Sequence, residues 1–266
     1  MALTISPISA FSDNYFWVIT NSDDPQRRVA VVDPGDASAV IAHLEKYRQQ
    51  LAAILITHWH PDHIGGVDEL AARYQIPVIG PRSKDIPQVT VTVSDGDHVC
   101  LFEATPYAAN LKVIAVPGHT LDHIAYFSDS PAQPRLFCGD TVFSAGCGRL
   151  FEGDGPMMWN SINKIKQLPE NTEIYCAHEY TLSNLKFAAA VEPDSAAVKQ
   201  RIKEATTLRD EGKPTIPTTL KGELNFNPFL RCDQNTVKSA VATEENLQNC
   251  DESVIFTALR RWKDRF

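Results

Sequence analysis

The densest set of chemically active side chains lies in the heptapeptide THWHPDH, residues 57–63. Its proline restricts His60 to an extended backbone, so His58, His60 and Asp62 are predicted to project to one side with a period of two. His63 follows where the chain turns into a predicted helix, and its imidazole can face a second position nearby. Imidazole and carboxylate groups are ligands that zinc prefers. The heptapeptide therefore predicts two adjacent metal sites.

The alternative is that these are ordinary core or surface histidines, which is the usual role of an isolated histidine. Three of the chain's eight histidines lie within residues 58–63, and a carboxylate lies among them. This density favours metal binding over a structural role.

Three further candidate ligands lie just beyond the carboxyl ends of predicted strands: His119, Asp140 and His178. Ligands and catalytic residues gather at this edge of an α/β sheet, so residues far apart in sequence can meet there in one crevice. Each of the three could be structural if taken alone. Their shared position favours a common site.

Alternating strands and helices are predicted to position these residues. Short apolar or β-branched runs bounded by Pro, Gly and Asp predict buried strands at 28–32, 53–57, 111–116, 135–138 and 173–177. Helical periodicity predicts helices at 37–50 behind Asp36, at 65–74 and at 156–168. This alternation predicts an α/β layered domain.

Beyond about Tyr180 the strand signals fade, and helices are predicted at 182–191, 195–211 and 253–265. Asp194 is the expected N-cap of the second of these helices, and Gly212 is its expected stop. The segments KPTIPTT and ELNFNPFLR separate the helices, and their prolines prevent them from being helical throughout. We expect an α/β domain over residues 1–180 and a small α-helical domain over residues 181–266.

Composition excludes several classes of protein. The chain has 266 residues, a net charge of −8 and no apolar run near the roughly 20 residues that a membrane-spanning helix requires. An acidic chain is a poor partner for nucleic acid, whose binding depends on Lys and Arg. The N-terminal segment lacks the basic region of a secretory signal, and the six cysteines form no CxxC pair. We expect a cytoplasmic protein with free thiols, acting as a monomer without membrane or nucleic-acid partners.

The motifs THWHPDH, PGHT, CGDTVF and CAHEY occur in the order typical of the metallo-β-lactamase superfamily, which the first 180 residues resemble. This resemblance implies an αββα sandwich and a binuclear centre. One metal would be held by His58, His60 and His119, the other by Asp62, His63 and His178, with Asp140 bridging them. A bridging hydroxide, held between metals that Asp140 and Asp62 ligate, would be the nucleophile. We expect two divalent ions, with zinc as the first choice and iron or manganese as alternatives.

The motifs FSDNYFW, GCGRLFEG, HEYT, NPFLR and LRRWKDRF extend a closer resemblance, to the glyoxalase II family, over almost the entire chain. That family hydrolyses S-D-lactoylglutathione and other 2-hydroxyacylglutathiones, a step of methylglyoxal detoxification, to D-lactate and glutathione. The resemblance implies that the glutathione part contacts Arg149, Tyr180, Arg260 and Lys263. Phe151, which stands where some relatives have Tyr, is also a candidate substrate-binding residue. Without the resemblance, the basic C-terminus would be interpreted as a solvated helix end, which the helix dipole also favours.

Other functions on the same scaffold remain alternatives at this point. They are a persulfide dioxygenase with a single iron, a hydrolase of a different thioester, a nuclease, and a non-catalytic module around a structural zinc. A closed structural zinc uses four ligands, fewer than the seven found here. His123 is expected to support the site rather than bind metal, Cys138 to be a buried strand residue, and His43 and His98 to lie outside the site. Asp122 stands where the family usually has Gly. Gly can adopt backbone angles that Asp adopts less readily, so the resemblance does not predict the loop conformation at this position.

Overall fold

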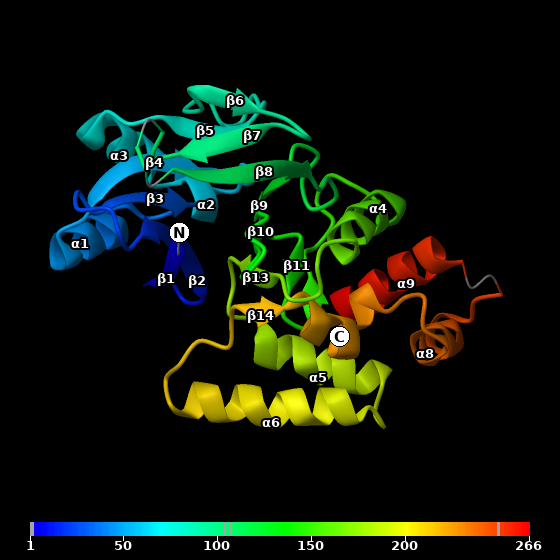
Figure 1. Ribbon diagram of the computed structural model, residues 1–266. Helices are drawn as coiled ribbons and strands as arrows, with labels where there is room; N and C mark the ends of the chain where they lie inside the picture. Colours follow the sequence, from blue (N-terminus) through cyan, green and yellow to red (C-terminus); the bar gives the residue numbers. More distant parts are fainter. Residues whose placement is uncertain (1–2, 104, 107, 249–250) are drawn as a thin grey trace. The chain divides into compact units, whose positions relative to one another are not determined.

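A six-stranded sheet forms the first layer of the chain. The computed structural model describes residues 3–103, 105–106, 108–248 and 251–266. The strand order is β1-β2-β3-β4-β5-β6, antiparallel from β1 to β3 and parallel from β3 to β6 (Figure 1). The strands are β1 (Leu3–Ala10), β2 (Asn14–Asn21), β3 (Arg28–Val32), β4 (Gln50–Leu55), β5 (Val78–Pro81) and β6 (Val91–Val93).

Helices cover one face of this sheet. They are α1 (Ala37–Tyr47), α2 (Pro61–Ile64) and α3 (Val67–Tyr74). Val40 of α1 and Leu70 of α3 are fully buried in one apolar cluster with Val31 of β3 and Ile54 of β4. Burial of this apolar face fixes the sheet, and therefore the loops that leave the carboxyl ends of β3 and β4.

Four antiparallel strands follow, in the order β10-β9-β8-β7. They are β7 (His98–Leu101), β8 (Ala109–Ala115), β9 (Ile124–Ser128) and β10 (Arg135–Gly139). Tyr126 of β9 is fully buried, and its hydroxyl reaches the carbonyls of Ile56 at 2.9 Å and Ile79 at 3.1 Å. A side chain of the second group of strands thus satisfies backbone groups of the first sheet.

The remaining elements are mostly helical. They are β11 (Val142–Phe143), β12 (Gly146–Cys147), α4 (Gly155–Lys166), β13 (Glu173–Cys176), α5 (Thr181–Val191), α6 (Ala196–Asp210), β14 (Thr218–Thr219), α7 (Leu220–Phe226), the 3₁₀ turn η1 (Pro228–Leu230), α8 (Asn235–Glu245) and α9 (Glu252–Arg265). β11 pairs with β12, and β13 with β14. Stacked and edge-on rings of Phe187, Phe229, Phe256 and Trp159 join α5, η1, α9 and α4.

By contacts the chain divides into two compact units. Unit 1 comprises Met1–Ala115 and Asp122–Gly139, and unit 2 comprises Val116–Leu121 and Asp140–Phe266. Within unit 2 the segment from Asp140 to β13 is therefore packed with the C-terminal helices. Among the described residues, no helix is both long enough and apolar enough to span a bilayer.

Most predicted elements occur, and the differences have local causes. The predicted strands match β3, β4, β8, β10 and β13 within a few residues. The predicted helix 65–74 begins only at Val67, because Gly65 is the C-cap of α2 and Gly66 is the N-cap of α3. A Cβ on either glycine would lie within 2.6 Å of the backbone of residues 34–37, so only Gly fits there. Pro61 instead starts the short helix α2, so the predicted extended, period-two arrangement of Asp62 with His58 and His60 is wrong.

Two details of the helical region also differ. Ser195, rather than the predicted Asp194, caps α6 by accepting a hydrogen bond from the Val198 amide at 3.3 Å. Gly212 has the left-handed φ of +69° expected of a helix stop. Helices α7 and α8 were not predicted, although Val237 and Val241 give α8 one turn of apolar spacing.

Tyr126→Phe is expected to lower the free energy of unfolding by about 1–3 kcal/mol, because the buried carbonyls of Ile56 and Ile79 lose a donor. Urea denaturation measures the change. Tyr47→Phe, at a side chain that is 47% exposed, is the control and is expected to change stability by at most about 0.5 kcal/mol. Equal stabilities of the two variants would contradict the role assigned to the Tyr126 hydroxyl.

Candidate metal centre and adjoining pocket

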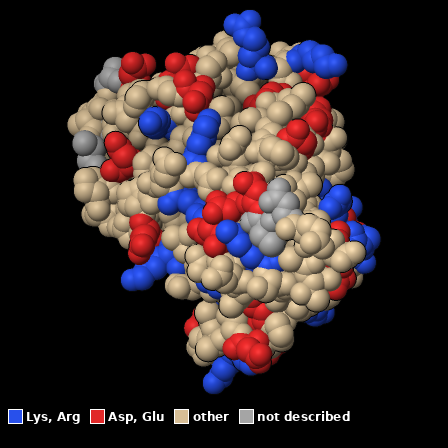
Figure 2. All heavy atoms as spheres, turned by 90° about the vertical axis from the view of Figure 1, so that its right-hand side faces the viewer, with Lys and Arg blue, Asp and Glu red and all other residues tan. Residues whose placement is uncertain are grey.

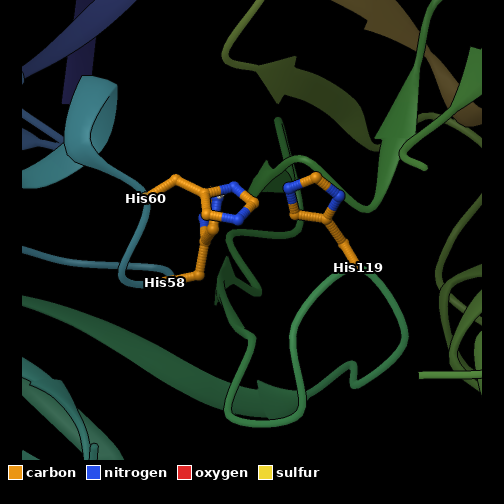
Figure 3. A group of neighbouring side chains, drawn as sticks. All are labelled: His58, His60 and His119. Carbon is orange, nitrogen blue, oxygen red and sulfur yellow. Dashed lines mark hydrogen bonds between the residues drawn. The ribbon is translucent and has the colours of Figure 1, made fainter. Parts of the chain in front are cut away.

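Unit 1 brings four of the predicted ligands together beyond β4. His58 and His63 are buried, with ring centroids 4.0 Å apart, and Nε2 of His58 lies 3.2 Å from Nδ1 of His60. Figure 3 shows the rings of His58 and His60 close together on the loop that follows β4. His63 Nε2 lies 3.5 Å from a carboxylate oxygen of Asp62. Such a set of imidazole nitrogens and carboxylate oxygen suits a divalent metal.

A buried carboxylate that the sequence analysis missed orients this group. Asp33 follows β3 and accepts hydrogen bonds from the amide of Thr57 at 2.7 Å, from the Thr57 hydroxyl at 2.6 Å and from His63 Nδ1 at 3.0 Å. The Thr57 hydroxyl in turn lies 3.0 Å from His58 Nδ1. Both imidazoles are thus held through Nδ1, which directs Nε2 toward the site. The signal that could have found Asp33 is its position at a strand end, as for His119, Asp140 and His178.

Two more side chains support the unit 1 residues. The amide of Asn14 donates to Asp62 at 2.9 Å. His123 is buried and stacks on His58 with ring centroids 4.5 Å apart, in agreement with its predicted supporting position. Asp122 has an ordinary negative φ, so the backbone there does not require Gly.

Unit 2 supplies the other three predicted ligands. One Asp140 carboxylate oxygen lies 3.4 Å from His119 Nε2, and the second lies 3.3 Å from His178 Nε2. Nδ1 of His119, the third residue labelled in Figure 3, lies 2.8 Å from the carbonyl of Arg149, which leaves Nε2 for the site. The Asp140 carboxylate thus has one oxygen near each of the two imidazoles.

A pocket of about 680 Å³ in unit 2 adjoins these residues. Its lining includes His119 and Asp140, and it also includes every residue predicted to contact substrate: Arg149, Phe151, Tyr180, Arg260 and Lys263. Lys186 of α5, which the sequence analysis did not single out, lines it too. Four cationic side chains face the pocket against Asp264 and Asp140, so its field favours an anionic molecule.

Aromatic rings join the pocket to the unit 2 histidines. The ring of Tyr180 stacks on His178 with centroids 4.7 Å apart, and Phe151 meets His119 edge-on at 5.3 Å. Phe151 is 63% exposed, so its ring lies at the solvent-facing edge of the pocket. It has no hydroxyl with which to bind a ligand there. A molecule bound among the cations therefore lies beside the residues around Asp140.

The two C-terminal cations predicted to bind substrate differ in their surroundings. Arg260 is buried, donates to the Cys147 carbonyl at 2.9 Å and pairs with Asp264 at 3.0 Å. Lys263 is partly exposed, and its ammonium lies 3.4 Å from the Ser183 carbonyl. Burial, and then the charge of Arg260, lower the pKa of Lys263 to about 8. Arg260 is thus held in place by its burial and its partners, whereas Lys263 is the less constrained of the two side chains.

The remaining histidines and the cysteines are assigned no role in the chemistry of this group. Cys138 is fully buried in β10, as predicted, and Cys250 lies outside the described residues. His43 lies on α1 against Tyr47, and His98 is exposed on β7. Cys147 lines the pocket, but burial raises its thiol pKa to about 11, so it is protonated near neutral pH and unsuited to act as a nucleophile.

Comparison with known proteins identifies the family of the chain. Residues 13–178 match the metallo-beta-lactamase superfamily, and residues 179–266 match the hydroxyacylglutathione hydrolase C-terminus. The hydroxyacylglutathione hydrolase of Aliivibrio salmonicida is 50% identical over 99% of this chain and 100% of its own length. The chain belongs to the hydroxyacylglutathione hydrolase family. The family protein of Hahella chejuensis is likewise 50% identical, over 98% of this chain and 99% of its own.

A solved structure shows a similar fold. ETHE1 from Myxococcus xanthus has a TM-score of 0.64 and 22% identity, and the match covers 99% of this chain and 98% of that one. The predicted metallo-β-lactamase fold, followed by a C-terminal helical region, is confirmed, as is the predicted family. The chain is a metal-dependent hydrolase of that family.

Proposed function

We propose that this protein hydrolyses the thioester of S-D-lactoylglutathione and related 2-hydroxyacylglutathiones to a 2-hydroxy acid and glutathione. The observation that carries the proposal is the cationic pocket that adjoins Asp140, His119 and His178. Glutathione has two carboxylates and one ammonium group, so a pocket with four cations suits it on a chain that is otherwise acidic. The full-length similarity to hydroxyacylglutathione hydrolases supports the same substrate.

Seven residues are proposed to hold two divalent ions. His58, His60 and His119 would ligate one, Asp62, His63 and His178 the other, and Asp140 both. The donor set fits, because imidazoles oriented through Nδ1, together with the carboxylates of Asp62 and Asp140, are the ligands that such ions take. When bound, the ions supply Lewis-acid chemistry, activating water and polarising the carbonyl. Zinc suits this set, and iron or manganese are also accommodated.

The protein's own residues are assigned to binding and orientation. The carboxylates of the glutathione part are attracted by the four pocket cations, Arg149, Lys186, Arg260 and Lys263. Tyr180 and Phe151 lie between these cations and the rings of His178 and His119. No general acid is needed, because a thiolate whose parent thiol has a pKa of about 8.5 can leave unaided.

The proposal also covers the roles of the two predicted domains, the oligomeric state and the location of the protein. We assign catalysis to residues 1–180 and substrate binding to residues 181–266, a division supported by the family matches that meet at residues 178 and 179. The proposed setting is a monomer in the cytoplasm that acts in methylglyoxal detoxification.

The test pairs metal analysis with activity on three substrates. We expect two divalent ions per chain and hydrolysis of S-D-lactoylglutathione, with no turnover of a β-lactam or RNA. A fully loaded, active protein with a single ion, or one that consumes oxygen with a glutathione persulfide, would contradict the proposal. We expect no RNA cleavage, because nucleic-acid binding depends on clustered Lys and Arg. On the face drawn in Figure 2, Lys and Arg lie among Asp and Glu.

The pKa of Lys263 predicts a pH dependence of substrate binding. As pH rises through about 8 the ammonium loses its proton and with it the attraction for a substrate carboxylate, so KM should rise about fivefold, the value of one partly exposed charge pair. Lys263→Arg keeps its charge at every pH tested and should flatten this rise. KM profiles at constant ionic strength provide the measurement.

Arg261→Ala is the control for Lys263, because Arg261 is exposed and faces Glu245 at 3.8 Å. Its KM profile should follow that of the unmodified protein. A Lys263→Arg profile that also rose fivefold would remove Lys263 from substrate binding.

A further inference from the structure

The turn at residues 143–146 joins β11 to β12 just after Asp140 and is held by side chains of the helical region. Asn184 of α5 donates to the Ser144 carbonyl at 3.1 Å. Glu223 of α7 accepts from the Ala145 amide at 2.8 Å. Asn227 donates to the carbonyls at both ends of the turn, Phe143 at 3.1 Å and Gly146 at 2.9 Å.

These side chains form a buried polar network. Asn227 and Glu223 are fully buried, Asn184 is 6% exposed, and the Asn227 amide also donates to Glu223 at 2.9 Å. Ala145 has a φ of +58°, a left-handed conformation that costs a residue with a Cβ free energy and persists only where the surroundings enforce it. The turn therefore depends on the network for its shape.

The turn lies next to residues of the site. The ring of Phe143 meets His178 edge-on at 5.7 Å and Tyr180 at 5.3 Å. Beyond the turn, the amide of Gly148 donates to the Thr141 carbonyl at 3.3 Å, and Gly148 packs so tightly on the Asp140 carbonyl that a Cβ there would lie 1.9 Å away. A shift of the turn would move Asp140 and the ring that supports His178.

We propose that Asn184, Glu223 and Asn227 are positioning residues that hold Asp140 and His178 in ligand geometry through the turn at residues 143–146. This inference rests on the proposed function, since it takes Asp140 and His178 as metal ligands. It gives the C-terminal region a second role besides binding substrate, because residues on α5 and α7 then determine metal retention.

The state of Glu223 suggests which substitution preserves the network. Burial raises the pKa of Glu223 to about 7, although the donors from Ala145 and Asn227 and the charge of Arg201 oppose the shift. A neutral side chain of the same shape is therefore tolerated in this dry environment. Gln has one oxygen to accept both hydrogen bonds, so Glu223→Gln is the conservative variant.

The experiment compares Glu223→Ala with Glu223→Gln. Metal affinity is measured by competition with a chelator, kcat and KM with S-D-lactoylglutathione, and stability by urea denaturation. Glu223→Ala should weaken metal affinity about 10- to 100-fold, the loss typical of removing support from a ligand, and should lower kcat. Glu223→Gln should restore both to within about threefold of the unmodified protein.

Glu192→Ala is the matched control, a buried acid of the same helical region that does not touch the turn. Glu192 accepts from Arg231 at 2.8 Å and Thr236 at 2.6 Å, so its loss should also destabilise the fold. Metal affinity and kcat of the folded control should stay unchanged. If Glu223→Ala fails to fold, Asn184→Ala takes its place. It removes a single donor to the turn, so metal affinity and kcat should fall by less than in Glu223→Ala.

Two results would overturn the inference. One is equal loss of metal affinity in the Glu192 and Glu223 alanine variants, which would indicate general destabilisation. The other is unchanged metal affinity and kcat in both Glu223→Ala and Asn184→Ala. Asp140→Asn, measured in parallel, separates the proposed ligand set from the positioning role. If Asp140→Asn loses metal while the Glu223 variants do not, only the positioning role fails. If Asp140→Asn keeps its metal, the proposed ligand set fails as well.

Discussion

Asp140→Asn should lower kcat/KM for S-D-lactoylglutathione by at least about a hundredfold, because several kcal/mol of metal-derived stabilisation depend on this ligand. The substitution keeps the size of the side chain but removes its charge and replaces one of the two oxygens that face His119 and His178. A neutral amide is a weaker ligand for a divalent ion than a carboxylate, so metal content after dialysis should fall together with activity. Elemental analysis and steady-state kinetics measure the two effects.

Asp154→Asn is the matched control for Asp140. Asp154 caps α4 by accepting from the Met157 amide at 2.8 Å, and Asn serves equally well as an N-cap. This variant should keep its metal and its turnover. Full metal content and unchanged kcat in Asp140→Asn would remove Asp140 from the site.

Asp33→Asn should produce the second largest effect, a loss of metal affinity by a factor of about 10 to 100. The tertiary structure should be retained. One amide oxygen can still accept from the Thr57 backbone. The amide nitrogen, however, would face the Thr57 hydroxyl and His63 Nδ1, which both donate to Asp33 in the native arrangement. His63 must then change its tautomer, which puts the proton on Nε2, or turn its ring, which points Nε2 away from the site; either change removes Nε2 as a ligand.

Asp36→Asn tests the same exchange three residues away. Asp36 is the N-cap of α1 and accepts from Ser38 at 2.8 Å, so Asn should preserve both helix and metal. Chelator competition on the two variants gives the comparison. Equal metal affinities would show that Asp33 does not orient His63 in the way the hydrogen bonds indicate.

Strands and helices with strong local signals were predictable from the sequence. β3 matches its predicted range of 28–32, because a β-branched run bounded by a turn leaves little ambiguity. α1 begins behind its predicted cap, Asp36. Weak elements were missed: α7 is only seven residues long and ends where Asn227 precedes Pro228, so its helical signal is short.

The candidate ligands were also predictable, but their supports were not. His58, His60, Asp62 and His63 stand in one heptapeptide, and the position of the others at strand ends marks them. Asn14 and Lys186 carry no comparable local signal, because their importance lies in which distant group they face, and Asp33 is marked only by its position directly after β3. Glu223 lies 78 residues from Ala145 and Asn227 lies 81 residues from Gly146, the turn residues that they bind.

The sequence by itself determined the family, the fold class and the types of ligand, because motif chemistry and strand or helix periodicity are local properties of the chain. Tertiary structure alone decided three things: that Pro61 starts a helix carrying Asp62, that Arg260 is buried on the Cys147 carbonyl while Lys263 stays adaptable, and that Asp33 holds His63. The physical reason is that burial and hydrogen-bond partners depend on residues brought together by folding. A charge or an imidazole acquires its role only when those neighbours are in place.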